Sequence, residues 1–240
     1  MNVVDCLQQK HNLIEIDTLF MEKLVMMYTK LLLSNEMNIE ALGNEEFLSD
    51  YQNIRLGIKI PSMIRPLVVS LLKKIGQKRS AVYAEYMGSK DTVSYNKMVM
   101  EKIRLQEKFE EIFTKHNLDA IISPIFSTPP CKHNEFKKTG YGVMYTAVFN
   151  IVDHPCVTIP RVHIIEKADT NLNEYKDRKY GEDPITKAMR ASLEGSEGLP
   201  IGVQVSTLTY QDEKCLGVSK NIDQTLRQKG VIKDIEFQKL

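Results

Sequence analysis

Three short motifs in this chain carry the residue types of a serine acylation site. An S-x-x-K motif lies at Ser70–Lys73, an S-x-N motif at Ser94–Asn96 and a K-T-G motif at Lys138–Gly140. In that order they could supply a nucleophilic serine, a lysine that accepts its proton and a substrate-binding strand. Their contexts argue against this chemistry, because Ser70 lies midway along an amphipathic pattern on its polar side and the K-T-G motif lies in a predicted loop. We interpret the matches as chance, since strings this short recur in unrelated sequences.

Two pairs of possible metal ligands are also present. Cys131 lies two residues before His133, and His154 lies two residues before Cys156. Neither pair has a matching second pair at the spacing of a zinc site, so the sequence predicts no metal and no other cofactor. The four cysteines are widely scattered, which argues against a disulfide framework and favours a reducing compartment.

The composition is that of an ordinary globular protein. The chain has 240 residues, of which 42% are hydrophobic and 26% charged, and its formal net charge is +1. A charge this close to zero supplies no field that would draw the protein to nucleic acid. The sequence shows no secretory signal pattern, and its longest strongly apolar stretch, 19–33, is interrupted by charged residues and too short to cross a bilayer. We therefore expect an intracellular protein without a transmembrane helix.

Hydrophobic periodicity and capping residues predict the main helices. We expect a short helix within 3–16 that leads into a strand at 13–16, then a buried helix from about 18 to 34 and a loop-rich region at 35–60. Further helices are predicted near 64–75, at 92–116 with Asn117 as a left-handed stop, at 141–152 and at 211–229.

Short apolar runs predict buried strands between these helices. They fall at 119–125, 156–160 and 198–204. Strands that alternate with helices indicate an α/β protein, and we expect a mixed, mainly buried sheet flanked by helices. Residues 163–197 are rich in charge, so we expect a surface excursion there, with one short helix near 184–193.

The segment 58–80 has a strongly amphipathic pattern. Apolar residues recur at helical spacing, and lysines and arginines occupy much of the remainder. A helix of this kind can dock on its own domain or bind a membrane surface. The pattern alone favours docking, and the neighbouring lysines support the membrane alternative. The residues of the candidate membrane-binding face are Ile64, Leu67, Val68, Leu71 and Leu72.

Three strings in the second half of the chain carry a family resemblance. In the last of them two glycines and a proline interrupt an apolar strand, which requires a turn at its start and a close backbone approach within it. The motif residues are Asp119 and Pro124 in the first string, Asn150, Asp153, Pro155 and Pro160 in the second, and Gly198, Pro200, Gly202 and Gln204 in the third. These strings resemble the LDxxxxP strand, the N-x-x-D-x-P helix-to-strand element and the GLPxGxQ strand of the amidase-signature hydrolases, with the closest similarity to the fatty acid amide hydrolase branch.

The resemblance implies that residues 1–240 form a partial amidase-signature domain, the C-terminal portion of that family's α/β/α fold. The family cleaves amides with a Ser–cis-Ser–Lys triad in which a buried lysine activates a serine of a glycine- and serine-rich loop. This chain has no adjacent serines and no such loop, so no catalytic residue can be transferred to it. Whether it acts as an enzyme on its own stays open at this point.

The resemblance also implies roles for particular residues and partners. Tyr145, Thr146 and Phe149 would line an acyl channel, although core packing is an equal alternative for Thr146 and Phe149, and segment 58–80 would be a membrane cap. The expected function is that of the acyl-channel and membrane-cap segment of a serine amidase, inactive alone and peripheral to a membrane. The alternative is a non-catalytic lipid- or membrane-binding pseudoenzyme. Expected partners are an acyl amide or lipid, a membrane surface, and an upstream amidase segment or a second copy of the chain.

Overall fold

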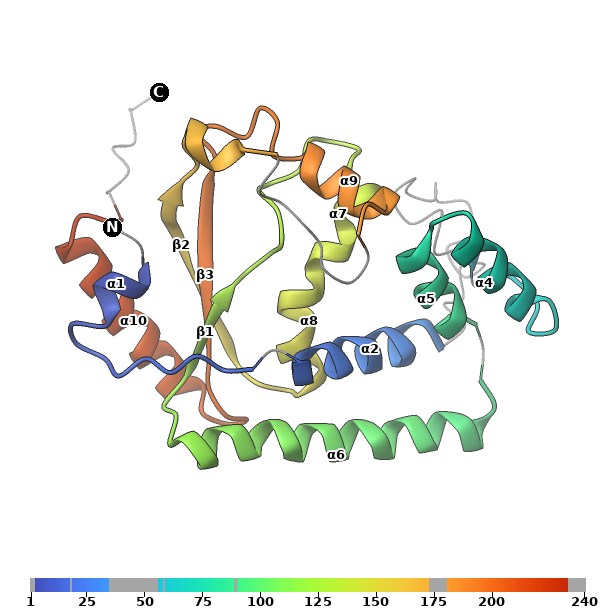
Figure 1. Cartoon of the computed structure of the whole chain (residues 1–240). Helices are drawn as coiled ribbons and strands as arrows, with labels where there is room; N and C mark the ends of the chain where they lie inside the picture. Colours follow the sequence, from blue (N-terminus) through green and yellow to red (C-terminus); the bar gives the residue numbers. More distant parts are fainter. Residues whose placement is uncertain are drawn as a thin grey trace, which may run out of the picture.

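Helices cover both faces of a small sheet. The computed structural model describes residues 3–17, 19–34, 56–57, 59–88, 90–172 and 181–232, and most of the predicted loop-rich region at 35–60 lies outside this description. Figure 1 shows the sheet between one layer that contains α1 and α10 and another that contains α2, α6 and α8, with α4 and α5 beyond the end of α2. The elements are α1 (Val3–Leu7), α2 (Leu19–Ser34), α4 (Arg65–Lys74), α5 (Lys78–Tyr86), α6 (Thr92–His116), β1 (Ile121–Pro124), α7 (Phe136–Thr139), η3 (Gly140–Val143), α8 (Met144–Ile151), β2 (Cys156–Ile164), η4 (Lys167–Thr170), α9 (Pro184–Ala191), β3 (Pro200–Ser206) and α10 (Asp212–Gln228).

The described strands form a three-stranded sheet in the order β1-β3-β2. Ser206 of β3 lies opposite Ile121 of β1 and opposite Cys156 of β2, and both pairings are antiparallel. The predicted α/β class with flanking helices is confirmed, but within the described residues the sheet is antiparallel rather than mixed. The reason is that β1 and β2 run in the same direction while β3 returns between them, so the two parallel strands are never neighbours.

Each face of the sheet has its own apolar core. The first lies among α2, α6 and α8, and the second lies between the sheet and the α1 and α10 helices, so each of these helices buries apolar side chains in one core. The buried residues of the first core are Leu24, Val25, Met27, Phe109, Phe113, Ile121, Val148, Phe149, Ile151 and Val152. Those of the second are Cys6, Leu7, Ile159, Val162, Val205, Ile222, Leu226 and Ile232.

The long helix α6 begins and ends as its sequence predicts. The carboxylate of Asp91 accepts a hydrogen bond of 2.9 Å from the backbone N–H of Ser94, which caps the first turn. At the other end Asn117 has a φ of 49°, the left-handed conformation that stops a helix. Phe109 and Phe113 hold the helix against the first core.

Two local predictions differ from the structure. Residues 12–17 form no strand, because Leu13 packs against the second core and Ile16 against the first, so the segment crosses between the layers. The amphipathic segment 58–80 contains parts of two helices, α4 and α5, rather than one. Gly76 separates them with a φ of +79°, a conformation that side chains strongly disfavour.

The charged segment 163–197 is partly packed on the domain. Asp183 caps α9 by accepting a hydrogen bond of 2.7 Å from the backbone N–H of Thr186. Ile185, Thr186 and Met189 of this helix are buried, and α9 lies against α7. Residues 173–180 of the segment lie outside the described residues, so its remaining surface character stays a prediction.

Candidate functional site

Gln204 joins the three motif strings at one point of the fold. Its side chain is buried in β3, and its Nε2 donates to the Ser123 hydroxyl at 3.0 Å, the Pro124 carbonyl at 2.9 Å and the Tyr145 carbonyl at 3.1 Å. Its Oε1 accepts from the Cys156 thiol at 3.4 Å. One carboxamide therefore connects β1, β2, β3 and α8, which explains why the motif ends on glutamine rather than on an apolar residue.

The glycines of the same motif serve the backbone. Gly198 has a φ of +82° in the turn before β3, and Pro200 begins the strand. A Cβ on Gly202 would lie 2.8 Å from the carbonyl oxygen of Ile159 and 3.2 Å from the Cα of Pro160. These contacts lie where the register of β2 shifts between Ile159 and His163, so Gly202 permits the close approach of a bulged strand.

Three further motif residues, Asp119, Asn150 and Asp153, lie near helix ends and in turns. Asp119 precedes β1 and forms an ion pair of 3.0 Å with Lys214. Asn150 is exposed near the end of α8, and its backbone carbonyl accepts a hydrogen bond of 3.4 Å from the backbone N–H of Asp153. Asp153 itself has a φ of 56° and forms an ion pair with Lys102 of α6. The two contacts of Asp153 position the turn between α8 and β2.

The three predicted channel residues divide between core and surface. Phe149 is 3% exposed, and its ring lies edge-on to Phe109 in the first core. Thr146 is half-buried and donates its hydroxyl to the Val143 carbonyl at 2.9 Å. Tyr145 is 40% exposed. Phe149 thus has a packing role in this structure, while channel lining by Tyr145 and Thr146 stays a prediction.

Helix α4 presents much of its predicted apolar face to solvent. It docks on α5 through Val69 and through Arg65, whose guanidinium donates to the carbonyls of Ala84 at 2.9 Å and Ile60 at 2.5 Å. Burial lowers the pKa of Arg65, although it retains its charge. Val68 and Leu72 are half-buried. The α4 face consists of the exposed apolar side chains Leu67 (72%) and Leu71 (57%) within the helix and Met63 (92%), Ile64 (48%) and Ile75 (59%) beside its ends.

The candidate acylation motifs have local structural roles instead. Ser70 is exposed on α4, and the Ser94 hydroxyl donates to the Asp91 carboxylate at 2.6 Å in the first turn of α6. The K-T-G motif is predicted to lie in a loop, but the structure places Lys138 and Thr139 at the end of α7. Thr139 is buried there and donates its hydroxyl to the Glu135 carbonyl at 3.4 Å. The three motifs lie on different helices, which agrees with their interpretation as chance matches.

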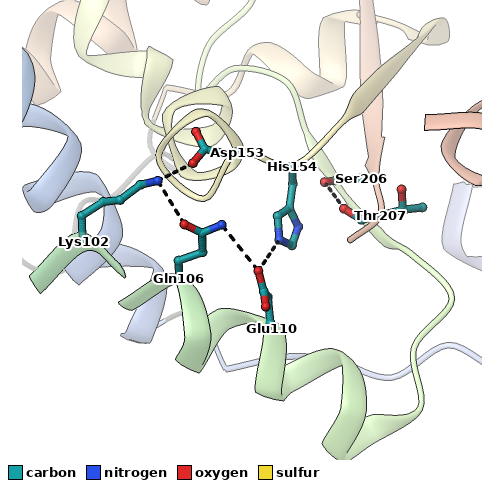
Figure 2. Close-up of polar contacts among 7 residues, drawn as sticks. All are labelled: Lys102, Gln106, Glu110, Asp153, His154, Ser206 and Thr207. Carbon is teal, nitrogen blue, oxygen red and sulfur yellow. Dashed lines mark hydrogen bonds and ion pairs between the residues drawn. The ribbon is translucent and has the colours of Figure 1, made fainter. Parts of the chain in front are cut away.

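The cavities on the described surface include two that bear on the site. One, of about 750 Å³, lies between α6, the turn after α8 and the loop that follows β3, and His154 lines it (Figure 2). The other, of about 570 Å³, lies beside α4, and its charged lining includes Arg65, Lys59, Lys73, Lys90 and Glu85. Sequence reasoning missed both, because a cavity depends on which distant residues meet. The sequence signals at the first cavity are the motif residues Asp153 and Pro155 and the histidine between them.

Neither a metal centre nor a membrane span is found in the described part of the chain. No group of three or more histidine, cysteine or acidic side chains is placed to hold a metal ion there. Across the same residues no helix combines the length and the apolar character needed to cross a bilayer.

Comparison with known proteins agrees with the motif geometry. The matching curated proteins include Fatty acid amide hydrolase 1 of Caenorhabditis elegans, 32% identical over 139 residues, which are 56% of this chain and 23% of that protein. Fatty-acid amide hydrolase 1 of Sus scrofa is 27% identical over 46% of this chain and 18% of its own length. An acetamidase of Aspergillus oryzae is 28% identical over 47% of this chain and 20% of its own length. The matched part therefore spans about a fifth of each of these relatives.

A solved structure titled Fatty acid amide hydrolase has the same fold. It superposes with a TM-score of 0.66 at 20% identity, covering 93% of this chain and 35% of that chain. The family model described as Amidase matches residues 2–216. With its motif strings joined through Gln204, this chain belongs to the amidase family.

Proposed function

We propose that this chain is the acyl-handling and membrane-facing segment of an amide hydrolase similar to fatty acid amide hydrolase. In this proposal the bond-breaking residues come from outside 1–240, either from sequence that precedes this segment or from a partner chain. The proposed substrate is an acyl amide or a related ester. The observation that carries the proposal is the solvent-exposed apolar face of α4 in a chain of the amidase family.

The exposed face of α4 supports binding to a membrane surface. Exposed apolar side chains gain about 25 cal/mol for each Å² that leaves water, so a contiguous face favours transfer into a lipid interface. Lys73 and Lys74 lie in the last turn of the same helix. Each cation near an anionic membrane surface adds about 1 kcal/mol, so electrostatics and burial act together. Arg65 and Val69 anchor the opposite side of the helix, which leaves the apolar face free to insert.

The serine nearest to glycines in the sequence is poorly suited to nucleophilic attack. Ser196 lies between Gly195 and Gly198, the only glycine-flanked serine near the motif strand. It is 1% exposed, and its hydroxyl donates to the Leu193 carbonyl at 2.7 Å. A nucleophile needs access to substrate and an adjacent base, and Ser196 is instead part of a turn.

Vesicle flotation tests the membrane part of the proposal. We expect the chain to float with vesicles of phosphatidylcholine and phosphatidylserine, and more weakly with phosphatidylcholine alone. Replacing three exposed residues of the α4 face by aspartate should abolish flotation. The substitutions are Met63→Asp, Leu67→Asp and Leu71→Asp.

A matched control separates this face from general surface hydrophobicity. It places three aspartates at exposed apolar positions of α6 and α10, where we expect flotation to be retained. The control residues are Val93 (63% exposed), Met100 (53%) and Leu216 (60%). Equal flotation of wild type and the α4 variant would exclude α4 as the membrane contact.

A fluorophosphonate probe tests the catalytic part independently. We expect no labelling of any serine in the chain alone, and labelling of the chain alone would overturn the proposal. Co-expression with an amidase segment that carries the serine-rich loop should restore amide turnover. If the chain floats but no such segment restores turnover, the non-catalytic lipid-binding alternative is favoured.

A further inference from the structure

The cavity beside His154 contains buried polar atoms that lack partners. The His154 side chain is completely buried, and neither ring nitrogen has a hydrogen-bond partner among the described residues. The hydroxyl of Thr209, also part of the cavity lining, is buried and unpartnered in the same described set. An unpaired buried polar group costs about 1–3 kcal/mol, so two in one cavity indicate a missing polar ligand.

The cavity wall is held in place before any ligand binds. Phe109 and Phe113 of α6 lie against the imidazole of His154, with ring centroids at 5.1 Å and 5.7 Å. The loop that carries Thr209 is closed by the buried hydroxyl of Thr207, which donates to the Gln211 carbonyl at 3.0 Å. The wall around both groups is therefore ordered, but because their polar atoms are buried, a ligand must displace neighbouring side chains slightly to reach them.

The electrostatics of the cavity favour a cation. Its acidic lining residues are Glu110, Asp153 and Asp212, and no lysine or arginine lines it in the described part of the chain. Lys102, just outside, is paired with Asp153, which leaves a net negative charge (Figure 2). Burial lowers the pKa of His154 to about 4, although the negative charge of Asp153 opposes the shift. At pH 7 the ring is therefore neutral, and one of its nitrogens can accept a hydrogen bond.

The geometry between His154 and Glu110 suits a nitrogen that carries several hydrogens. His154 Nε2 and Glu110 Oε1 are 4.0 Å apart, too far for a direct hydrogen bond. A donor atom about 2.8 Å from both would subtend an angle of about 90°, which two N–H groups of one ammonium can match. Thr209, in the same lining, carries a hydroxyl oxygen that can accept a further N–H. A metal ion fits poorly because no three histidine, cysteine or acidic side chains of the described residues are grouped so that they could hold one.

We propose that this cavity binds a small primary ammonium, held by the Glu110 carboxylate, the His154 imidazole and the Thr209 hydroxyl. Leu208 and Pro155 in the same lining provide apolar surface for a short alkyl chain. The site is separate from the α4 face and does not depend on the function proposed above.

The experiment measures binding of butylammonium to the full chain at pH 7 by isothermal titration calorimetry and ligand-observed saturation-transfer NMR. We expect saturable binding, and at least tenfold weaker binding of tetramethylammonium, which has the same charge but no N–H donor. Glu110→Gln should weaken butylammonium binding at least tenfold, whereas Glu111→Gln, an exposed neighbour on α6, should leave it unchanged.

Thr209→Val provides a second test if Glu110→Gln disturbs the fold, which thermal melts will reveal. It should lower butylammonium affinity severalfold. Equal affinity for both ammonium ions, indifference to both variants, or no saturable binding would overturn the proposal, and the last result would indicate that the cavity holds only water.

Discussion

Replacing Gln204 by leucine should destabilise the whole fold. Its carboxamide has two N–H groups that serve three acceptors on two other elements, at 2.9–3.1 Å. Each such hydrogen bond contributes about 1 kcal/mol net, and leucine replaces neither donor, so the free energy of unfolding should fall by about 2 kcal/mol. Because the contacts join β1 and α8 to the central strand, the loss should be global rather than local.

Urea unfolding followed by far-UV circular dichroism measures this change. The midpoint should fall while the slope stays constant, since the unfolded state is not altered. Gln228→Leu is the control, because this exposed glutamine bonds only to Lys10, at 3.3 Å, in the described structure. Its unfolding free energy should change by less than about 0.5 kcal/mol. If Gln204→Leu were equally mild, the glutamine would not be the structural connection that we describe.

Two further changes probe the strand and the cavity. Gly202→Ala should lower the free energy of unfolding by about 1–3 kcal/mol, because the added Cβ meets the backbone of β2. Gly217→Ala in α10, where the added Cβ meets open space, should raise it by about 0.5–1 kcal/mol. Similar shifts of the urea midpoint in the two variants would refute the close approach at Gly202. His154 has a folded pKa of about 4, below its ordinary value, so between pH 6.5 and 4 the unfolded chain takes up a proton that the folded chain does not, and stability should fall by about 3 kcal/mol as the pH drops. His154→Phe should remove this part of the pH dependence, and identical pH profiles for both proteins would contradict the burial of a neutral imidazole.

Local sequence signals predict those elements whose ends and faces are determined within one segment. Asp91 and Asn117 mark the two ends of α6, and both act as the sequence predicts. The glycine and proline spacing of the last motif likewise predicts a strand with a close backbone approach, and Gly202 lies against the backbone of β2. In each case the physical requirement concerns the backbone of the residue itself.

Features that depend on distant partners were beyond the sequence. Lysines and arginines fill the polar positions of segment 58–80, yet the guanidinium of one of them, Arg65, is buried among backbone carbonyls. Phe149 belongs to the core because Phe109 of α6 meets it there. The cavity of His154 likewise arises from three segments that are separate in sequence. The strand order of the sheet requires β3 to enter between two earlier strands.

The open edges of the sheet bear on how the chain behaves alone. β1 and β2 each pair only with β3 among the described strands, so both have one unpaired edge there. Unpaired edges and an exposed apolar helix face favour association. We therefore predict that the isolated chain is oligomeric or poorly soluble.

The most direct test of the proposed function is the turnover of a long-chain acyl amide by the purified chain, measured in the presence of phosphatidylcholine and phosphatidylserine vesicles. The proposal predicts that the chain binds the vesicles and releases no acid above the uncatalysed background. Steady release of acid by this polypeptide alone, abolished by substitution of one of its own serines, would contradict it.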